Sequence, residues 1–144
     1  MSRNDPFAAT RFLLEIDGLV PAGFMTCTGL ESFTEIIEYR EGSDRATLRK
    51  LPGLHRHGNI VLSRGVTTST ELADWYRTTL TGQTERRNGA IVLMDDAGEP
   101  ATRWEFREGW PCRLQGPDLH AMESAVAIET LEICHEGLQR VGGR

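Results

Sequence analysis

The sequence has 144 residues, of which 39% are hydrophobic and 26% are charged, as is typical of one globular domain with one core. This length leaves no room for a second domain of ordinary size. The formal net charge of -5 and the pI near 5.4 argue against general nucleic-acid binding, because the molecule repels phosphate unless its sixteen basic residues gather on one surface.

The cysteines and the N-terminus bear on where the protein is made. Cys27, Cys112 and Cys134 are odd in number and share no CxxC spacing. The opening MSRNDPFAAT lacks the apolar core of an export signal, and no apolar run approaches the roughly 20 residues of a membrane helix. We therefore expect synthesis in the reducing cytoplasm and no membrane span.

The first predicted element is a strand over residues 10–17. Phe12, Leu14 and Ile16 recur at every second position, and an Asp-Gly pair typical of a turn follows. This strand is expected to bury one face.

Two further strands are predicted over residues 22–30 and 33–40. In the second, the neighbouring residues Ile36 and Ile37 point to opposite sides, since side chains alternate along a strand. Both faces of this segment are therefore expected to contact apolar surface.

A long connector is predicted over residues 41–58, where glycines and a proline interrupt the periodic pattern. Connectors longer than about 12–15 residues are uncommon in compact domains and are usually functional or disordered. Leu48, Leu51 and Leu54, spaced three apart, argue against disorder because they need a surface on which to dock.

A strand at residues 59–65 leads into the only predicted helix, at about 69–81. Thr68 and Glu71 predict a capping box at its start. An amphipathic stripe follows at Leu72, Trp75, Tyr76 and Leu80. We expect this helix to pack on a sheet.

A hairpin is predicted over residues 90–106. Ile91 and Leu93 alternate on its first strand, DDAGEP supplies the turn, and Trp104 and Phe106 alternate on the return.

The last strand is predicted over residues 124–137. Val126 and Ile128 share one parity, whereas Leu131 and Ile133 share the other. A β-bulge that switches faces is the simpler explanation, and contact on both faces is the alternative. Together the elements predict a single, mainly β domain over 1–144: two packed antiparallel sheets forming a sandwich or small barrel, with one flanking helix and the long loop.

Metal binding has little support. His55 and His57 are one residue apart and could chelate from a strand, and Cys134 and His135 are further ligand types, but no third ligand stands at a familiar interval. A solvated stretch of chain is the favoured interpretation. No metal or other cofactor is expected.

Catalysis has little support either. The sequence contains no GxSxG, GxxxxGK[ST] or GxGxxG motif. Asp95, Asp96 and Glu99 flank a turn, where such residues are expected for backbone reasons. We expect no catalytic residues and no enzymatic activity.

Three features call for another explanation: the leucine-bearing connector, the strand with two apolar faces, and acids embedded in strand sequence at Glu35, Glu38, Glu129 and Glu132. Self-assembly explains all three, because a neighbouring subunit can cover a loop and a second face while the acids line a wet surface. A small-ligand-binding β-barrel is the alternative from another functional class.

An ordered series of motifs narrows the choice. It consists of DPFAATRFLLEIDGL at 5–19, EYREG at 38–42, RKLPGL and NIVLSRG within 49–65, ERRNGAIVLMDDAG at 85–98, and WPCRLQGPDL with AIETLEICHEGL within 110–138. In this order the motifs resemble the tail tube proteins of contractile phages and phage-tail-like injection systems. The resemblance covers residues 5 to about 140.

The resemblance implies hexameric rings that stack into a hollow tube inside a contractile sheath. Its partners would be further copies of the chain, sheath protein, baseplate and tube-initiator proteins, a cap or terminator, and cargo effector or DNA in the lumen. Such proteins are assembled in the bacterial cytoplasm and become part of a tail or tail-like particle. A tube-initiating or tube-capping paralogue is the alternative within this class.

The resemblance also implies roles for particular residues. It places the connector at contacts between subunits, with a core motif of Arg49, Lys50, Leu51, Pro52, Gly53 and Leu54, followed by His57. Strands near 33–40 and 124–134 would contribute to a continuous inner barrel, so that Glu35, Glu38, Glu129 and Glu132 are candidates to face the lumen.

Three positions depart from the family pattern. His57 stands where an aromatic residue is common, Leu114 where tryptophan is frequent, and His120 where asparagine is frequent. A histidine in an interface would make assembly sensitive to pH through its titration.

Overall fold

The structure, a computed structural model, describes residues 11–43, 46–119, 121 and 127–142. These ranges contain ten strands and one helix, so the prediction of a mainly β fold with one helix is confirmed. All strand pairs among them are antiparallel.

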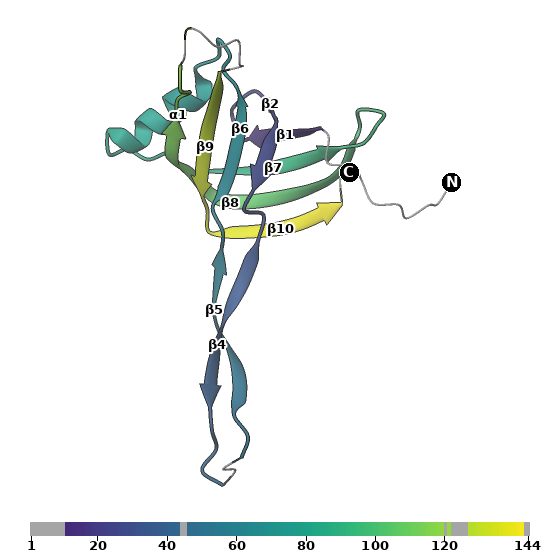
Figure 1. Ribbon diagram of the computed structural model, residues 1–144, viewed down its shortest axis with the longest axis vertical. Coiled ribbons are helices and arrows are strands. Elements are labelled where there is room, and N and C mark those ends of the chain that lie inside the picture. Colours follow the sequence, from purple (N-terminus) through teal and green to yellow (C-terminus); the bar gives the residue numbers. More distant parts are fainter. Residues whose placement is uncertain (1–10, 44–45, 120, 122–126, 143–144) are drawn as a thin grey trace.

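Eight strands form the sheet of the body (Figure 1). They are β1 (Phe12–Ile16), β2 (Ala22–Phe24), β3 (Thr26–Thr28), β6 (Ile60–Gly65), β7 (Arg87–Met94), β8 (Pro100–Gln115), β9 (Ile128–Cys134) and β10 (Gly137–Gly142). Their order is β2-β1-β7-β8-β9-β6-β3, and β10 pairs with β8 beside this path. The sheet is open at β2 and β3, so of the two predicted forms the closed barrel is not adopted.

The long strand β8 divides this sheet into two halves. Its first part pairs with β7 and β10, and its second part, from Trp110, pairs with β9. The change of partner follows Glu108, which has a positive φ of 55° and whose N–H donates to Asn88 Oδ1 at 3.1 Å. Gly109 follows, where a Cβ would lie 2.5 Å from the Phe106 ring. The bend therefore requires a residue without a side chain at position 109.

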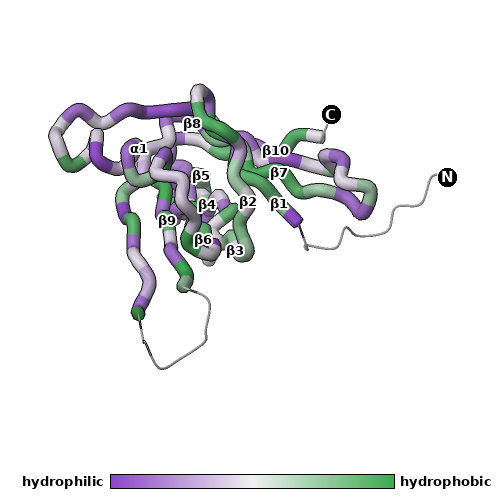
Figure 2. The backbone as a smooth tube through the Cα atoms, turned by 90° about the horizontal axis from the view of Figure 1, so that it is seen from above, coloured by the Kyte–Doolittle hydropathy of each residue, from purple (hydrophilic) through white to green (hydrophobic). Residues whose placement is uncertain are grey.

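The core lies between the two halves of the sheet. Its largest fully buried members include Leu14, Ile60, Leu62, Ile91, Leu131 and Ile133. Figure 2 shows hydrophobic stretches along β1 and β7. The alternation predicted for residues 10–17 and for the hairpin at 90–106 therefore identified one wall of the core.

The helix α1 (Glu71–Leu80) closes one end of the core with Leu72 and Trp75. The indole N–H of Trp75 donates to the Glu85 carbonyl oxygen at 2.8 Å, which satisfies its buried polar atom. The predicted capping box is wrong: the helix begins after Thr70, and no side chain caps it. The apolar stripe is shorter than predicted, since Leu80 is 68% exposed.

Half of the segment predicted as a long connector, residues 49–57, is a strand. β4 (Ser32–Tyr39) pairs with β5 (Arg49–His57) in a two-stranded sheet that projects from the body, and we call residues 32–57 the arm (Figure 1). β5 has no buried face to impose a period, and Pro52 is tolerated because a two-stranded ribbon consists of edge strands. Neither feature gives a strand signal in sequence.

Two details near the C-terminus also differ from prediction. The predicted bulge in the last strand is absent from the β9–β6 pairing; the register shift lies on β8, between Pro111 and Arg113. Val126, which motivated that bulge, lies outside the described residues. Strand β10 was not predicted. The segment predicted as one strand at 22–30 is divided between β2, which pairs with β1, and β3, which pairs with β6.

Candidate assembly surface

The root of the arm is held rigidly to the body. Gly29 has a φ of +89°, and a Cβ there would lie 1.8 Å from the Asn59 carbonyl oxygen, so the chain crosses at a distance that only glycine permits. The Gly58 N–H donates to the Glu31 oxygen at 3.1 Å, and His135 Nε2 donates to the Gly58 oxygen at 3.0 Å. The direction of the arm is therefore set by the body.

Two histidines meet at this root. The rings of His57 and His135 are 5.4 Å apart, and His57 Nδ1 is hydrogen-bonded to Ser32 Oγ at 2.8 Å. Burial lowers the pKa of His135, and the nearby His57 lowers it further, against the opposing effect of the bond to Gly58. His135 Nδ1 is buried and has no hydrogen-bond partner among the described residues. Protonation would place a positive charge in this partly buried site, and the backbone hydrogen bonds to Gly58 and Gly137 offset only part of that cost.

We expect the folded subunit to lose stability as pH falls through about 6.5, the ordinary pKa of histidine. Because folding lowers the pKa of His135, the unfolded chain binds this proton more readily, and acid favours unfolding. Urea unfolding of the unassembled chain between about pH 7.5 and pH 5.5 measures the loss. His135→Gln, which does not titrate, should show a smaller loss; an equal loss in both proteins would contradict the assignment to His135.

Polar pairs connect the two strands of the arm. Thr34 Oγ1 and His55 Nδ1 are hydrogen-bonded at 2.8 Å, and Arg56 Nε contacts Glu35 Oε1 at 2.6 Å. Both members of the ion pair are exposed, so it contributes little to stability in water. Thr34 and His55 are directly opposite each other in the register of the two strands.

The arm is unusually apolar for an exposed element. Of the twelve large hydrophobic residues exposed among the described residues, seven belong to it: Phe33, Ile36, Ile37, Tyr39, Leu48, Leu51 and Leu54. Ile36 and Ile37 are 66% and 50% exposed and face opposite sides of β4. Both faces of the arm thus present apolar atoms to solvent in the single chain, which is the arrangement expected of a surface covered by another molecule.

All residues predicted for the inter-subunit contact lie together on this arm. Arg49, Lys50, Leu51, Pro52, Gly53, Leu54 and His57 belong to β5, and only Gly53 and His57 are half-buried. Lys50 is opposite Glu38, and Leu51 is opposite Ile37. The structure brings these residues into one continuous ribbon.

The four acids proposed for the lumen do not lie together. Glu35 and Glu38 are on opposite faces of β4 in the arm, and Glu129 and Glu132 are on opposite faces of β9 in the body. Glu129 is on the core side with Leu131, where the 7% exposed Arg64 contacts it at 2.6 Å. A single lumen can receive at most one acid from each strand.

Glu132 points to the other side of β9, onto a polar surface. It accepts a hydrogen bond from Asn59 Nδ2 at 2.8 Å and lies 4.0 Å from Arg113 Nη1. The register puts several hydroxyl and amide side chains on this side, and we call the polar set the hydroxyl face: Thr26, Thr28, Ser63, Arg113, Gln115, Thr130 and Glu132. Val61 and Ile128 share the same side. The sequence did not reveal it because its members come from four separated strands.

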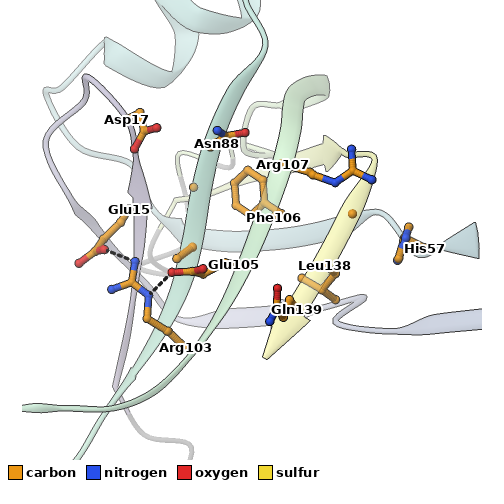
Figure 3. Close-up of a pocket in the computed structure, with 13 residues that line it drawn as sticks. Glu15, Asp17, His57, Asn88, Arg103, Glu105, Phe106, Arg107, Leu138 and Gln139 are labelled. Atoms are coloured by element: carbon orange, nitrogen blue, oxygen red, sulfur yellow. Dashed lines mark hydrogen bonds and ion pairs between the residues drawn. The ribbon is translucent and has the colours of Figure 1, made fainter. Parts of the chain in front are cut away.

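A polar cavity of about 560 Å³ opens beside the root of the arm, between β1, β7, β8 and β10 (Figure 3). Arg103 lies at its floor, 3.0 Å from Glu15 Oε1 and 3.2 Å from Glu105 Oε2. Asp17, His57 and Arg107 also line this cavity, so it is a charged and polar hollow.

Other kinds of site find little support in the described part of the chain. No group of three or more His, Cys, Asp or Glu residues there is arranged to hold a metal ion. No described helix has the length and apolar character needed to cross a membrane. The arm and the hydroxyl face remain the surfaces with distinctive chemistry.

Comparisons with known protein families and curated proteins show what the chain is similar to in sequence. The sequence profile of the T4-like virus tail tube protein gp19 family matches residues 8–139. No curated protein matches the chain in sequence at a significant level.

Solved structures give a wider comparison. A chain in the PVC sheath-tube complex of an extracellular contractile injection system, in the extended state, is 27% identical with a TM-score of 0.86, over 96% of this chain and 93% of that one. A chain in the anti-feeding prophage baseplate is 27% identical with a TM-score of 0.83, over 99% of each chain. Hcp1 from Flavobacterium johnsoniae shares the fold at 21% identity, with a TM-score of 0.56, over 92% of this chain and 96% of that one.

Proposed function

Since the chain belongs to the T4-like virus tail tube protein family and is thus a structural tube protein, we propose that its copies close into hexameric rings that stack into the hollow inner tube of a contractile injection system or phage tail. The observation that carries this proposal is the arm, a projecting ribbon with apolar side chains on both faces that the single chain leaves uncovered. A head-to-tail contact made by such a projection extends a stack without limit.

The energetics of the arm support an obligate contact. Fully burying one Leu, Ile or Phe side chain contributes about 1.5–3 kcal/mol, and the arm offers several. Permanent assemblies commonly bury roughly 2,000 Å² or more in total. The contacts at Gly29 and Gly58 tie the root of the arm to the body, which reduces the conformational freedom lost when the arm docks.

We assign the lumen to the hydroxyl face. This face lies on the side of the β3-β6-β9-β8 half opposite the core, and its one acid, Glu132, is offset by Arg113. A lining that is polar and nearly neutral lets cargo pass without strong adhesion. Of the four acids first considered for the lumen, Glu132 is the one that this assignment retains.

The partners follow from the same proposal. They are a contractile sheath around the tube, baseplate and tube-initiator proteins at one end, a cap or terminator at the other, and cargo effector or DNA within. The subunit performs no catalysis, and assembly takes place in the bacterial cytoplasm before the particle acts.

A tube-initiating or tube-capping paralogue is the second candidate. It is favoured by the similarity to chains in the anti-feeding prophage baseplate and in the PVC sheath/tube terminator, the latter at 27% identity with a TM-score of 0.86. The number of copies per particle separates the two: a main tube protein outnumbers the baseplate components many times, whereas an initiator or cap forms one or a few rings.

The sequence offers a direct test of arm docking, because Lys50 is its only lysine and lies in β5. A carbodiimide joins an amine to a nearby carboxylate without a spacer. In assembled tubes we expect Lys50 to be joined to a carboxylate of a neighbouring subunit, giving a ladder of covalent oligomers on a denaturing gel. Mass spectrometry of mixed light and heavy-nitrogen subunits distinguishes these links from links to Glu38 of the same chain.

The matched control is Lys50→Arg, which keeps the charge but removes the reactive amine. Its tubes should form normally and give no ladder beyond the contribution of the N-terminal amine. A wild-type protein that forms tubes in which Lys50 is joined only within its own chain would overturn the placement of the arm.

A further inference from the structure

Two of the three cysteines lie side by side on neighbouring strands. The register pairs Trp110 of β8 with Cys134 of β9, and the shift between Pro111 and Arg113 leaves Cys112 as an extra residue between the next two pairs, which contain Ile133 and Glu132. The Cys112 thiol donates to the Glu132 carbonyl oxygen at 3.5 Å and lies 4.0 Å from Asn59 Nδ2. The bulge thus holds Cys112 against the β9 segment that ends in Cys134.

The two thiols also interact directly. Burial and, to a smaller extent, a hydrogen bond with the Cys134 side chain together raise the pKa of the Cys112 thiol to about 12. Both cysteines are free and half-buried. Such a pair remains a dithiol in a reducing compartment and reacts slowly, because the thiolate is the attacking form.

The third cysteine is separated from this pair by the sheet. Cys27 of β3 is opposite Leu62, and it packs against the core. Glu132 and Cys134 share the other face of β9, since they are two residues apart. Cys27 therefore serves as an internal control thiol within the same protein.

We propose that Cys112 and Cys134 are a redox site, at which thiol–disulfide exchange with a small-molecule disulfide such as oxidised glutathione closes an intramolecular disulfide that joins β8 to β9. The Cys134 thiolate attacks the external disulfide, releases one glutathione thiol and forms a mixed disulfide. The Cys112 thiolate then attacks the Cys134 sulfur and releases the second glutathione thiol. The protein loses two protons and two electrons, and both are recovered in the two reduced glutathione molecules.

The closed bond would join the two strands that carry Arg113 and Glu132 of the hydroxyl face. It constrains the unfolded chain by a loop that spans the segment between β8 and β9. We therefore expect the oxidised protein to have a Tm higher by roughly 5–10 °C. This site is independent of the proposed function, since it concerns the single folded chain.

The test uses the purified full chain, treated with oxidised glutathione at about pH 8.5, where more thiolate is present. We expect an intact mass lower by two hydrogen atoms and, after proteolysis without reductant, a peptide pair joined through Cys112 and Cys134. Cys112→Ser should stop at the glutathione adduct on Cys134, whereas Cys27→Ser should close as the wild type does. A wild-type protein that keeps glutathione without closing, joins Cys27, or forms only intermolecular disulfides would overturn the proposal.

Discussion

Replacing Leu51 and Leu54 by aspartate is expected to abolish tube formation while leaving the single chain folded. The two leucines are 45% and 65% exposed in the subunit, so neither contributes much to its core. Burying them at a contact would contribute about 3–6 kcal/mol together, and two aspartates would lose that contribution and add the cost of burying charge. The same loss of binding free energy occurs at every subunit contact along the stack.

Sedimentation and negative-stain electron microscopy measure the assembly, and circular dichroism of the soluble fraction measures the fold. The matched control replaces both leucines by methionine, which keeps apolar atoms at the same positions, and should form tubes. Normal tubes from the double aspartate variant would refute the assignment of the arm to the subunit contact.

Leu131→Ala is expected to destabilise the subunit itself, by about 2–5 kcal/mol. Leu131 is 1% exposed and lies in β9, which pairs with both β6 and β8, so its side chain packs in the middle of the core. Removing it leaves a cavity that the surrounding strands cannot fill. The free energy of unfolding of a whole domain is only about 5–15 kcal/mol, so this substitution would remove a large share of it.

Urea unfolding of the unassembled chain measures this loss, and Leu54→Ala is the matched control. The control makes the same chemical change at a 65% exposed position and should alter the free energy of unfolding by less than about 0.5 kcal/mol. Equal losses in the two variants would show that the arm leucine is buried in the free subunit, contrary to the structure.

Part of the body could be predicted from the sequence because some of its strands have one buried face. Leu14 and Ile16 of β1 alternate with half-exposed neighbours, and Thr102 and Phe106 of β8 are buried on one face. Strand β7 differs, because the consecutive residues Ala90, Ile91 and Val92 are all buried and Leu93 is half-buried. The arm could not be predicted as a ribbon, because β5 buries no face and contains Pro52. Its leucines are exposed in the single chain, and their docking on another copy stays a prediction.

The candidate site was less accessible to sequence reasoning. The motif Arg49–Leu54 could be singled out because it is contiguous, whereas the hydroxyl face is assembled from β3, β6, β8 and β9 by pairings between distant segments. Parity alone would have shown that Glu129 and Glu132 face opposite sides of one strand, since they are three residues apart. What it could not show is that Arg64 engages Glu129 on the core side.

The central claim, that this chain builds the inner tube, is tested most directly on native particles. A lysate of cells that make the whole assembly is sedimented at high speed, the pellet is probed for the protein, and the particles are imaged by negative-stain electron microscopy. We predict that the protein is the major component of tubes inside rod-shaped particles. Finding it only in the small-particle soluble fraction, while the other components of the assembly are made, would contradict the claim and favour a small-ligand-binding β protein instead.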